Sequence, residues 1–457
     1  MLNLRSATAA SRNFIWRNTR WSAFPHRRGL LTLAIETSCD DTSVAIVDRT
    51  SSGAKIHFLE NLTSDNTAYQ GIHPIRALES HQENLATLVN KALSHLPFAA
   101  DSEIDNSKLI SLSNGTTIRQ KPDFISVTRG PGMRSNLFVG LDTAKGLSVA
   151  WQIPFVGVHH MQAHLLTPRL VSALSPPSND QTVTPGFPFL SILASGGHTI
   201  LVTSTSLTNH AVLATTSDIA IGEALDKVAR HILPEELLKT SKNTMYGKLL
   251  EQYAFPNGPA DYTDYVAPRT RGDEIAVSKR QSGYGWSLTT PYANTRELAF
   301  SFAFLATAIS HIIAKRQTPL LDAERRVMAR EVMRTCFEHL ASRTIIALES
   351  LPVDQPIKTL VVSGGVAANR FLMAVLRSFL DVRGFGHVGI VAPPPALCTD
   401  NAAMIGWAGI EMFEAGWRSE LSVRALRKWS LDGARTEGGD GGEGGGGVLG
   451  VGGWVRV

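Results

Sequence analysis

Residues 31–48 read LTLAIETSCDDTSVAIVD, an apolar run, a turn rich in hydroxyls and carboxylates (Thr37 to Thr42), and a second apolar run. Apolar runs of this length, bounded by turn residues, are typical of buried β-strands. Residues 187–204, FPFLSILASGGHTILVTS, repeat the pattern around a turn from Ser195 to Thr199. One such hairpin near the start of each half predicts a duplicated α/β fold with a cleft between two lobes.

The segments between the hairpins favour helices that alternate with further strands. In residues 84–96 the apolar side chains fall on one face at helical spacing. We also expect helices over 134–150, 324–351 and 368–379. Strands alternating with helices indicate an α/β architecture.

Composition divides the chain into further parts. We expect the two lobes at 31–173 and 189–431, joined by a Pro- and Ser-rich linker over 174–188. Residues 240–294 lack periodicity and are predicted to be an insertion in the second lobe. Residues 432–457 contain 12 glycines and are predicted to be disordered, because such a segment buries too little apolar surface.

The first 30 residues carry six arginines, no lysine and no acid, so the rest of a chain of net charge +4 is at −2. An Arg-rich, hydroxyl-bearing, acid-free leader is typical of a mitochondrial transit peptide. A basic arm that binds nucleic acid is the alternative. The leader predicts import into the mitochondrial matrix.

The whole-chain composition is that of a globular protein, with 43% hydrophobic and 18% charged residues in 457. This length can hold two domain-sized cores. No run of eighteen apolar residues occurs, so we expect no membrane span and no membrane partner. Three dispersed cysteines, Cys39, Cys336 and Cys398, indicate a reducing compartment and no structural zinc site.

Two histidines and one aspartate are candidate metal ligands. His160 and His164 in GVHHMQAHLL lie four residues apart, which places both imidazoles on one helical face. Packing or surface roles are about equally frequent for such a pair. Gln162 cannot supply the general base of the HExxH metallopeptidase motif, which is absent. Asp400, before an Ala/Gly-rich helix, is either a helix N-cap or an oxygen ligand.

Three glycine-rich turns are candidate anion-binding sites. Gly130–Gly132, Ser195–Gly197 and Gly364–Gly365 each follow a predicted strand, and backbone N–H groups at such turns attract phosphates. Ordinary tight turns are the alternative role. No Walker A motif is present.

Other polar residues remain open to two interpretations. Asp40 and Asp41 either cap the first hairpin turn or direct a carboxylate into the cleft. The insertion interleaves aromatic and basic residues, which fits either RNA binding or a solvated loop. These residues are Tyr262, Tyr265, Arg269, Arg271, Lys279, Arg280, Tyr284 and Trp286.

The chain resembles the transferases that make N6-threonylcarbamoyladenosine in tRNA, a family long mislabelled O-sialoglycoprotein endopeptidases. The Arg-rich leader and the motif TRGPGM…GLDTAKGL are similar to those of the family's mitochondrial branch. Eight motifs in family order, covering roughly residues 31–415, carry the resemblance: LAIETSCDDTSVAIVD, GIHPIRALESH, DFISVTRGPGM…VGLDTAKGLSVAW, PFVGVHHMQAHLL, FPFLSILASGGHTILV, IGEALDKVAR, LVVSGGVAANR and CTDNAAMIGWAG.

The resemblance implies the fold of the actin–hexokinase–heat-shock chaperone superfamily, two ribonuclease-H-like lobes with the active site in the cleft between them. The implied reaction transfers a threonylcarbamoyl group from threonylcarbamoyl-adenylate, made by a separate synthase, to N6 of the adenosine 3′ of the anticodon. The acceptors are mitochondrial tRNAs that read codons beginning with A. A homodimer is also implied.

The resemblance also assigns site residues. One divalent metal ion, zinc or iron, is implied at His160, His164 and Asp400. Asp40 matches the family's functionally sensitive acid, and we expect it to orient or deprotonate the adenosine amine. The implied substrate contacts are Leu193, Ala194, Ser195, Gly196, Gly197, Asp226, Gly247 and Asn369.

The chain departs from the family pattern in two places. Gln162-Ala163 stands where members often have Glu-Gly, and LAFSFAFLAT replaces the common DFSFSGLK. Contacts from these segments are therefore not carried over. A metallopeptidase, a sugar- or acetate-kinase-like phosphotransferase and a non-catalytic RNA-binding protein are the alternative functions, the last weakened by the near-neutral mature charge.

Overall fold

The computed structural model describes residues 29–66, 69, 72–98, 106–112, 117–175, 182–241, 246–277, 279–352, 355–434 and 446–457. The predicted transit peptide, apart from its last two residues, lies outside these ranges. None of the helices in these ranges is both long and apolar enough to cross a membrane.

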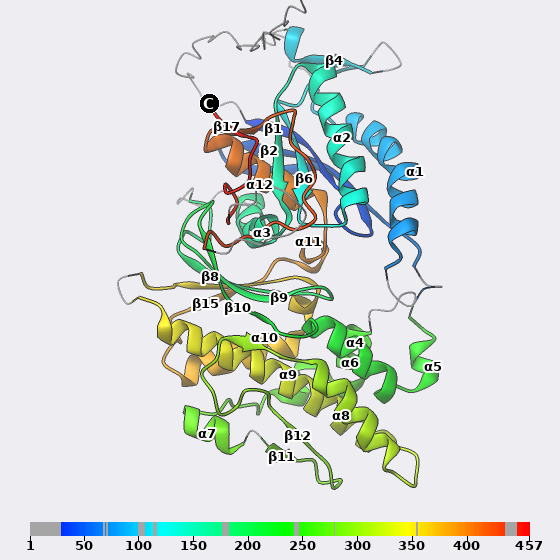
Figure 1. Cartoon of the computed structure of the whole chain (residues 1–457), viewed down its shortest axis with the longest axis vertical. Coiled ribbons are helices and arrows are strands. Elements are labelled where there is room, and N and C mark those ends of the chain that lie inside the picture. Colours follow the sequence, from blue (N-terminus) through cyan, green and yellow to red (C-terminus); the bar gives the residue numbers. More distant parts are fainter. Residues whose placement is uncertain are drawn as a thin grey trace, which may run out of the picture.

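Two mixed sheets with the same strand pattern form the centre of the molecule (Figure 1). The first has the order β3 (Gly53–Thr63), β2 (Asp41–Thr50), β1 (Leu30–Glu36), β6 (Phe124–Gly130), β7 (Phe155–His159). The second has the order β13 (Ala299–Phe300), β10 (His210–Thr216), β9 (Thr199–Ser204), β8 (Phe189–Ala194), β14 (Thr359–Ser363), β15 (Gly389–Val391). In both, the first strand of the hairpin is antiparallel to its partner and parallel to the strand on its other side. This repetition confirms the predicted duplicated α/β fold.

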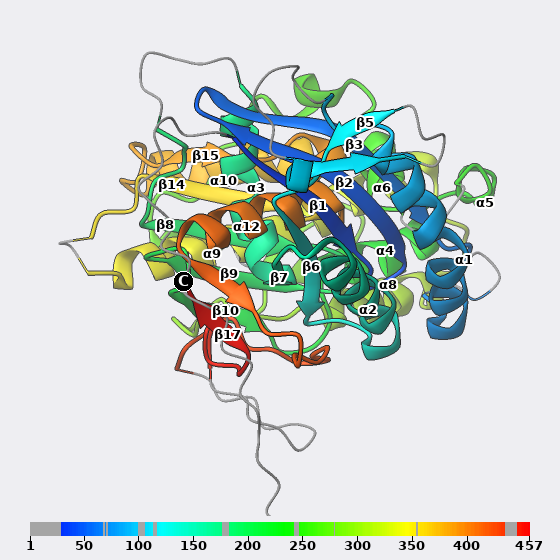
Figure 2. The same ribbon diagram turned by 90° about the horizontal axis from the view of Figure 1, so that it is seen from above.

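Helices form layers outside and between the sheets (Figures 1 and 2). The first sheet is covered by α1 (Pro74–Leu93) and α2 (Arg134–Trp151), and α3 (His160–Leu174) and α12 (Ala402–Glu414) lie between the sheets. The second sheet is covered by α4 (Ile221–Ile232), α8 (Ala303–Ala314), α9 (Asp322–Ser350) and α10 (Arg370–Val382). Alternation along β1 explains this layering, because Leu33 and Ile35 face α1 and α2 while Ala34 packs with α12.

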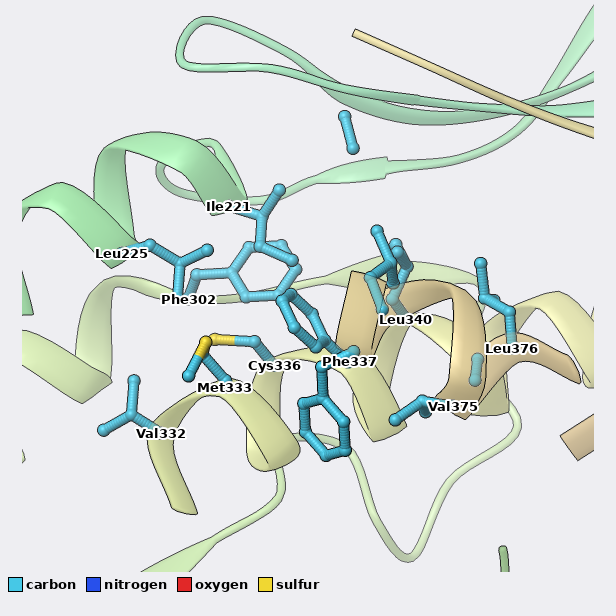
Figure 3. Packing of buried hydrophobic residues seen from close by; sticks show 14 of the residues in the cluster. Ile221, Leu225, Phe302, Val332, Met333, Cys336, Phe337, Leu340, Val375 and Leu376 are labelled. Carbon is cyan, nitrogen blue, oxygen red and sulfur yellow. The ribbon is translucent and has the colours of Figure 1, made fainter. Parts of the chain in front are cut away.

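The core of the second lobe fills the space beneath its sheet (Figure 3). Phe302, Phe337 and Leu340 are fully buried there, and Cys336 packs beside them. Complete burial of a large apolar side chain contributes about 1.5–3 kcal/mol, so this cluster holds α4, α9 and α10 against the strands that carry the second turn.

Predicted helices occur with small shifts at their ends. The bounds of α2, α9 and α10 lie within three residues of the predicted ones. The start of α1 lies ten residues before the predicted position, at Pro74. His73 explains the early start, since its side chain accepts a hydrogen bond from the backbone N–H of Arg76 and proline suits the first helical position.

The predicted insertion, residues 240–294, packs on the second lobe. Trp286 is buried, and Tyr262 and Tyr265 pack around the ring of Phe371. Several aromatic residues considered for RNA binding are therefore used in internal packing. The insertion contains α6 (Gly247–Ala254), η3 (Gly258–Tyr262), α7 (Arg271–Ala276), β11 (Lys279–Gln281) and β12 (Ser287–Thr289).

The C-terminal part of the chain returns to the first lobe, which corrects two predictions. α12 packs against β1, β2 and β6, so the second lobe does not extend to residue 431. The predicted disorder of residues 432–457 is wrong for 446–457, where β17 (Trp454–Arg456) pairs with β16 (Trp417–Ser419) and Val448 is fully buried. Valine, leucine and tryptophan between the glycines supply the apolar surface that this packing needs. Residues 435–445 lie outside the described ranges.

Short elements complete the described part of the fold. They are η2 (Asn106–Lys108), β4 (Leu109–Ser111), β5 (Ile118–Gln120), α5 (Glu235–Leu238), η4 (Gly365–Ala368) and α11 (Pro395–Cys398).

Candidate functional site

His160, His164 and Asp400 come together between the two sheets. Strand β7 leads directly into α3, so His160 is the first residue of that helix and His164 lies one turn further on. The Nε2 atoms of His160 and His164 lie 3.5 and 3.0 Å from Oδ1 of Asp400. One ligand atom from each of the three residues lies within 4.8 Å of the others. Both imidazoles are buried.

Asp400 is not the N-cap of α12. The side chain of the next residue, Asn401, accepts the hydrogen bond from the backbone N–H of Met404 at 3.0 Å. This leaves the Asp400 carboxylate free to face the two histidines. The capping role considered from the sequence therefore belongs to Asn401.

Glu36 contacts this cluster, although the sequence did not single it out. It ends β1, is fully buried, and its Oε2 lies 3.2 Å from Nδ1 of His160 and 2.5 Å from the Thr128 hydroxyl. A carboxylate only accepts, so His160 donates through Nδ1 to Glu36 and turns its Nε2 towards Asp400. Carboxylates commonly orient metal-binding histidines in this way. The only signal in the sequence is an acid at the end of an apolar strand.

At this cluster, interactions between charges shift the pKa values more than burial does. Burial alone would lower the pKa of His160, but the charges of Asp400 and Glu36 outweigh it and raise this pKa well above its usual value. Burial would likewise raise the pKa of Asp400, yet the charge of His160 holds it well below its usual value. Both pKa shifts favour a positively charged His160 beside a negatively charged Asp400.

The chemistry of this cluster fits a divalent metal ion. Two imidazole nitrogens and one carboxylate oxygen suit zinc or iron. Glu36 fixes the tautomer that presents Nε2 of His160 towards Asp400. Nδ1 of His164 is buried without a hydrogen-bond partner among the described residues. A ligand that takes the Nε2 lone pair would leave Nδ1 of His164 as the protonated nitrogen.

Asp40 lies beside this cluster and is not one of its three members. Its backbone oxygen accepts from Ser64 N at 2.9 Å, and the preceding carbonyl, of Cys39, accepts from His81 and Asn136 at 3.0 and 2.6 Å. Burial raises the pKa of the Asp40 carboxyl, and the negative charge of Asp400 raises it further. The structure therefore holds Asp40 on a clamped turn within electrostatic range of Asp400.

The turn after β8 presents backbone groups at the surface. Oγ of Ser195 accepts from the N–H groups of Gly197 and His198 at 3.2 and 3.0 Å, which fixes the turn. Gly196 and Gly197 are exposed, and a Cβ atom on either would meet only open space. Leu193 and Ala194 are buried in β8, so their side chains face the protein interior.

Three other predicted substrate residues occupy local structural roles. Oδ1 of Asp226 accepts from Tyr246 N and Gly247 N at 2.7 and 3.0 Å, so Asp226 and Gly247 are brought together at the start of α6. Burial raises the pKa of Asp226 to about 6. The Asn369 side chain caps α10, accepting from Leu372 N at 3.1 Å. Asp226 and Asn369 are not in contact with the histidine–aspartate cluster.

His198 is a second residue that the sequence reasoning did not select. Desolvation by the surrounding chain is the main cause that lowers the pKa of His198, although part of the residue is exposed. The charges of His160 and His164 lower this pKa further. The turn after β8 therefore lies within electrostatic range of His160 and His164.

Gln162, where the chain departs from the family pattern, makes a contact away from the cluster. Its Nε2 donates to Leu207 O at 2.8 Å.

The chain is similar to a family of known proteins. Residues 57–407 match the family model described as TsaD: tRNA N6-adenosine threonylcarbamoyltransferase. The mitochondrial tRNA N6-adenosine threonylcarbamoyltransferase of Schizosaccharomyces pombe is 39% identical over 423 residues, 89% of this chain and 87% of the relative. The Brucella suis enzyme of the same name is 34% identical over 408 residues, 88% and 95% of the two chains. Among solved structures, (R)-2-hydroxyglutaryl-CoA dehydratase component A of Acidaminococcus fermentans superposes with a TM-score of 0.39 at 12% identity, over 84% of this chain and 96% of that one.

Proposed function

Because the chain belongs to the tRNA N6-adenosine threonylcarbamoyltransferase family, mitochondrial branch, we propose that it transfers a threonylcarbamoyl group from threonylcarbamoyl-adenylate to N6 of the adenosine 3′ of the anticodon. The proposed acceptors are mitochondrial tRNAs that read codons beginning with A. The protein is a transferase that modifies tRNA.

The observation that carries the proposal is the convergence of His160, His164 and Asp400 next to two surface turns. The turn that holds Asp40 meets the cluster through Ser38, whose Oγ lies 3.2 Å from Nδ1 of His160. The turn after β8 lies close enough to the cluster for the charges of His160 and His164 to lower the pKa of His198. A donor with an adenylate at one end and a carbamoyl-threonine at the other needs a phosphate-binding turn next to a metal site.

His160, His164 and Asp400 would hold a divalent metal ion, which would polarise the carbamoyl-threonine oxygens as a Lewis acid. The exposed turn Ser195–Gly197 binds the adenylate phosphate through the N–H of Gly196, because the N–H groups of Ser195 and Gly197 already donate within the turn. The carboxylate of Asp226 accepts hydrogen bonds from the ribose hydroxyls.

The transfer step forms one bond and breaks another. The adenosine N6 attacks the carbamoyl carbon, a C–N bond forms, and the C–O bond to the phosphate breaks with release of AMP. The amine loses one proton, which we assign to the Asp40 carboxylate. Burial and the neighbouring Asp400 raise the pKa of Asp40, and a general base with a raised pKa accepts a proton more readily.

The test is a double variant, His160→Ala/His164→Ala, compared with His387→Ala, an exposed histidine before β15. Elemental analysis, circular dichroism and transfer to an unmodified tRNA transcript are measured on all three proteins. The double variant is expected to stay folded, lose its metal and lose transfer, whereas the control keeps both. Full metal occupancy in the double variant contradicts the ligand assignment.

The same assays separate the rival activities. A metallopeptidase would cleave candidate proteins in a manner that needs His160, and a phosphotransferase would consume ATP without a tRNA. Transfer of the threonylcarbamoyl group to tRNA, detected as the modified nucleoside, is the expected result. Its absence with intact metal and donor refutes the proposed function.

The relative in Schizosaccharomyces pombe is named as mitochondrial, and we place this chain in the mitochondrial matrix, with residues 1–30 as the import signal. A tagged chain without those residues is expected to remain in the cytosol, and a cytosolic location of the intact chain contradicts this. A homodimer that receives its donor from a separate synthase completes the proposal. Sedimentation of the purified chain tests the dimer, and omission of the synthase from the coupled assay tests the donor source.

A further inference from the structure

A surface of four cations lies beside the turn that carries Asp40. We name it the basic rim, and it consists of Arg134 at the start of α2 with Arg424, Arg427 and Lys428 in the segment after β16. All four side chains are exposed. Residues 421–431 contain no acid, and neither do residues 124–141. Among the described residues, none forms an ion pair with a member of the basic rim.

The backbone under the basic rim is pinned at four points. Lys145 Nζ donates to Val423 O at 2.5 Å and Arg129 Nε donates to Arg424 O at 3.1 Å. Leu426 N donates to Arg129 O at 2.9 Å, and Gly132 N donates to Arg427 O at 3.3 Å.

Side chains alternate along this segment between core and solvent. Val423, Ala425 and Trp429 are buried, while Arg424 and Arg427 are exposed between them. A solvated loop would show neither the alternation nor the pinned backbone. The segment therefore displays its cations in a fixed arrangement, which lowers the entropy lost on binding a partner.

Gly130 lets this segment approach closely, and Gly132 does the same for the turn of the first hairpin. A Cβ atom on Gly130 would overlap the carbonyl oxygen of Leu426, and a Cβ on Gly132 would lie 2.7 Å from the carbonyl oxygen of Ser38. The sequence reasoning considered Gly130–Gly132 as a phosphate-binding turn. In the structure this turn instead joins the basic rim to the turn of the first hairpin.

The basic rim is connected to the candidate site by a short chain of contacts. Arg427 O accepts from Gly132 N, and the next residue, Met133, donates its N–H to Ser38 O at 2.9 Å. The Ser38 hydroxyl in turn lies 3.2 Å from Nδ1 of His160. A polyanion held on the rim would therefore lie close to Asp40 and the histidines. The positive end of the α2 dipole starts at the same place.

From this arrangement we propose that the basic rim binds the phosphate backbone of the tRNA anticodon arm and delivers the target adenosine to the site. The inference rests on the proposed function and adds the surface on which the acceptor binds. Phosphate contacts position a nucleic acid without reading its sequence, so the rim supplies affinity and orientation. The net charge of −2 for the chain without its leader makes such a concentration of unpaired positive charge distinctive.

The test replaces the three rim residues of one segment and compares a charge-matched control. The rim variant is Arg424→Gln/Arg427→Gln/Lys428→Gln. The control is Lys55→Gln/Lys358→Gln/Arg456→Gln, three exposed cations on β3, before β14 and on β17. The substituted side chains of the rim variant make none of the four pinning hydrogen bonds, so the fold should be retained. Binding of an unmodified tRNA transcript is measured by fluorescence anisotropy between about 50 and 200 mM salt.

The rim variant is expected to bind the tRNA at least about tenfold more weakly. Its binding should also depend less on salt: the magnitude of the negative slope of log K against log salt should fall by about 3, roughly one unit for each phosphate that is no longer neutralised. Metal content and donor binding should match the wild type, and the KM for tRNA should rise with little change in kcat. The control should change neither affinity nor slope. Single Lys428→Gln, with an expected slope change of about 1, provides the same comparison if the triple variant does not fold.

Equal affinity and slope in the rim and control variants overturn the proposal. That result leaves the proposed function standing, provided that the wild type still transfers the group to tRNA. Conversely, a wild type that binds tRNA through the rim but transfers nothing refutes the proposed function and supports the rim. Charge-conserving Arg424→Lys/Arg427→Lys/Lys428→Arg should restore binding, and failure to do so contradicts a purely electrostatic contact.

Discussion

Glu36→Gln isolates the contribution of a buried charge to the metal site. The amide has nearly the volume of the carboxylate, so the end of β1 should keep its shape. The substitution removes the negative charge that lies 3.2 Å from Nδ1 of His160 and is fully buried. Without that charge, His160 is a weaker base and its ring orientation is less strictly fixed.

Two physical arguments give the same magnitude. A hydrogen bond to a charged group contributes about 1.5–3 kcal/mol. Loss of a residue that orients a metal-binding histidine costs about 10–100-fold in metal affinity, or about 1.4–2.7 kcal/mol. We therefore expect Glu36→Gln to weaken metal binding by about 10–100-fold while the protein remains folded.

Thr128→Val is the matched control for this experiment. Thr128 donates to the same carboxylate oxygen at 2.5 Å, and valine keeps its shape while leaving the charge of Glu36 in place. The control should lose about 1.5–3 kcal/mol of folding stability and keep metal affinity within about threefold of the wild type. Competition against a coloured zinc chelator gives the affinity, and the absorption bands of the cobalt-substituted protein report on ligand geometry. Equal metal affinity in Glu36→Gln and Thr128→Val would refute the role of the charge.

Three further predictions concern other parts of the site. Asp40→Asn should leave donor binding near normal by calorimetry and slow transfer to tRNA by at least about a hundredfold, whereas a turn-capping role predicts almost no change in rate. Asp226, whose raised pKa is about 6, is ionised above that value, so affinity for a non-hydrolysable donor analogue should fall as pH drops through about 6. Asp226→Asn should abolish that step, and an unchanged pH profile in the variant would contradict it. Gly364→Ala should destabilise the fold by about 1–3 kcal/mol in denaturant titrations, because φ at Gly364 is +92° and a Cβ would overlap the carbonyl oxygen of Ala194; wild-type stability would contradict this.

The sequence by itself determined the elements that depend on neighbours along the chain. Apolar runs bounded by turn residues placed both hairpins, and apolar spacing located most of α9 and α10. The four-residue spacing of His160 and His164 placed both imidazoles on one face of α3. These features follow from periods of 2 and 3.6 residues, which are local properties.

Only the tertiary structure decided which polar groups meet. Asp400 lies 236 residues from His164, and no local pattern distinguishes its carboxylate from the neighbouring cap, Asn401. Glu36 ends an apolar strand, and only the packing of α3 beside β1 gives it a partner in His160. Such contacts depend on how the sheets and helices pack, and the pairing of distant groups leaves no periodic trace in the sequence.

The same reason explains the wrong prediction of disorder at residues 446–457 and the internal packing of aromatic residues in the insertion. Glycine content predicted disorder after residue 432, but a few buried side chains, Val448 among them, hold residues 446–457 against the first lobe. Trp286, considered as an RNA-stacking residue, is buried and donates its indole N–H to Glu324 at 3.0 Å. Composition averages over a segment, whereas burial of single side chains is decided by the surface that the rest of the fold presents to them.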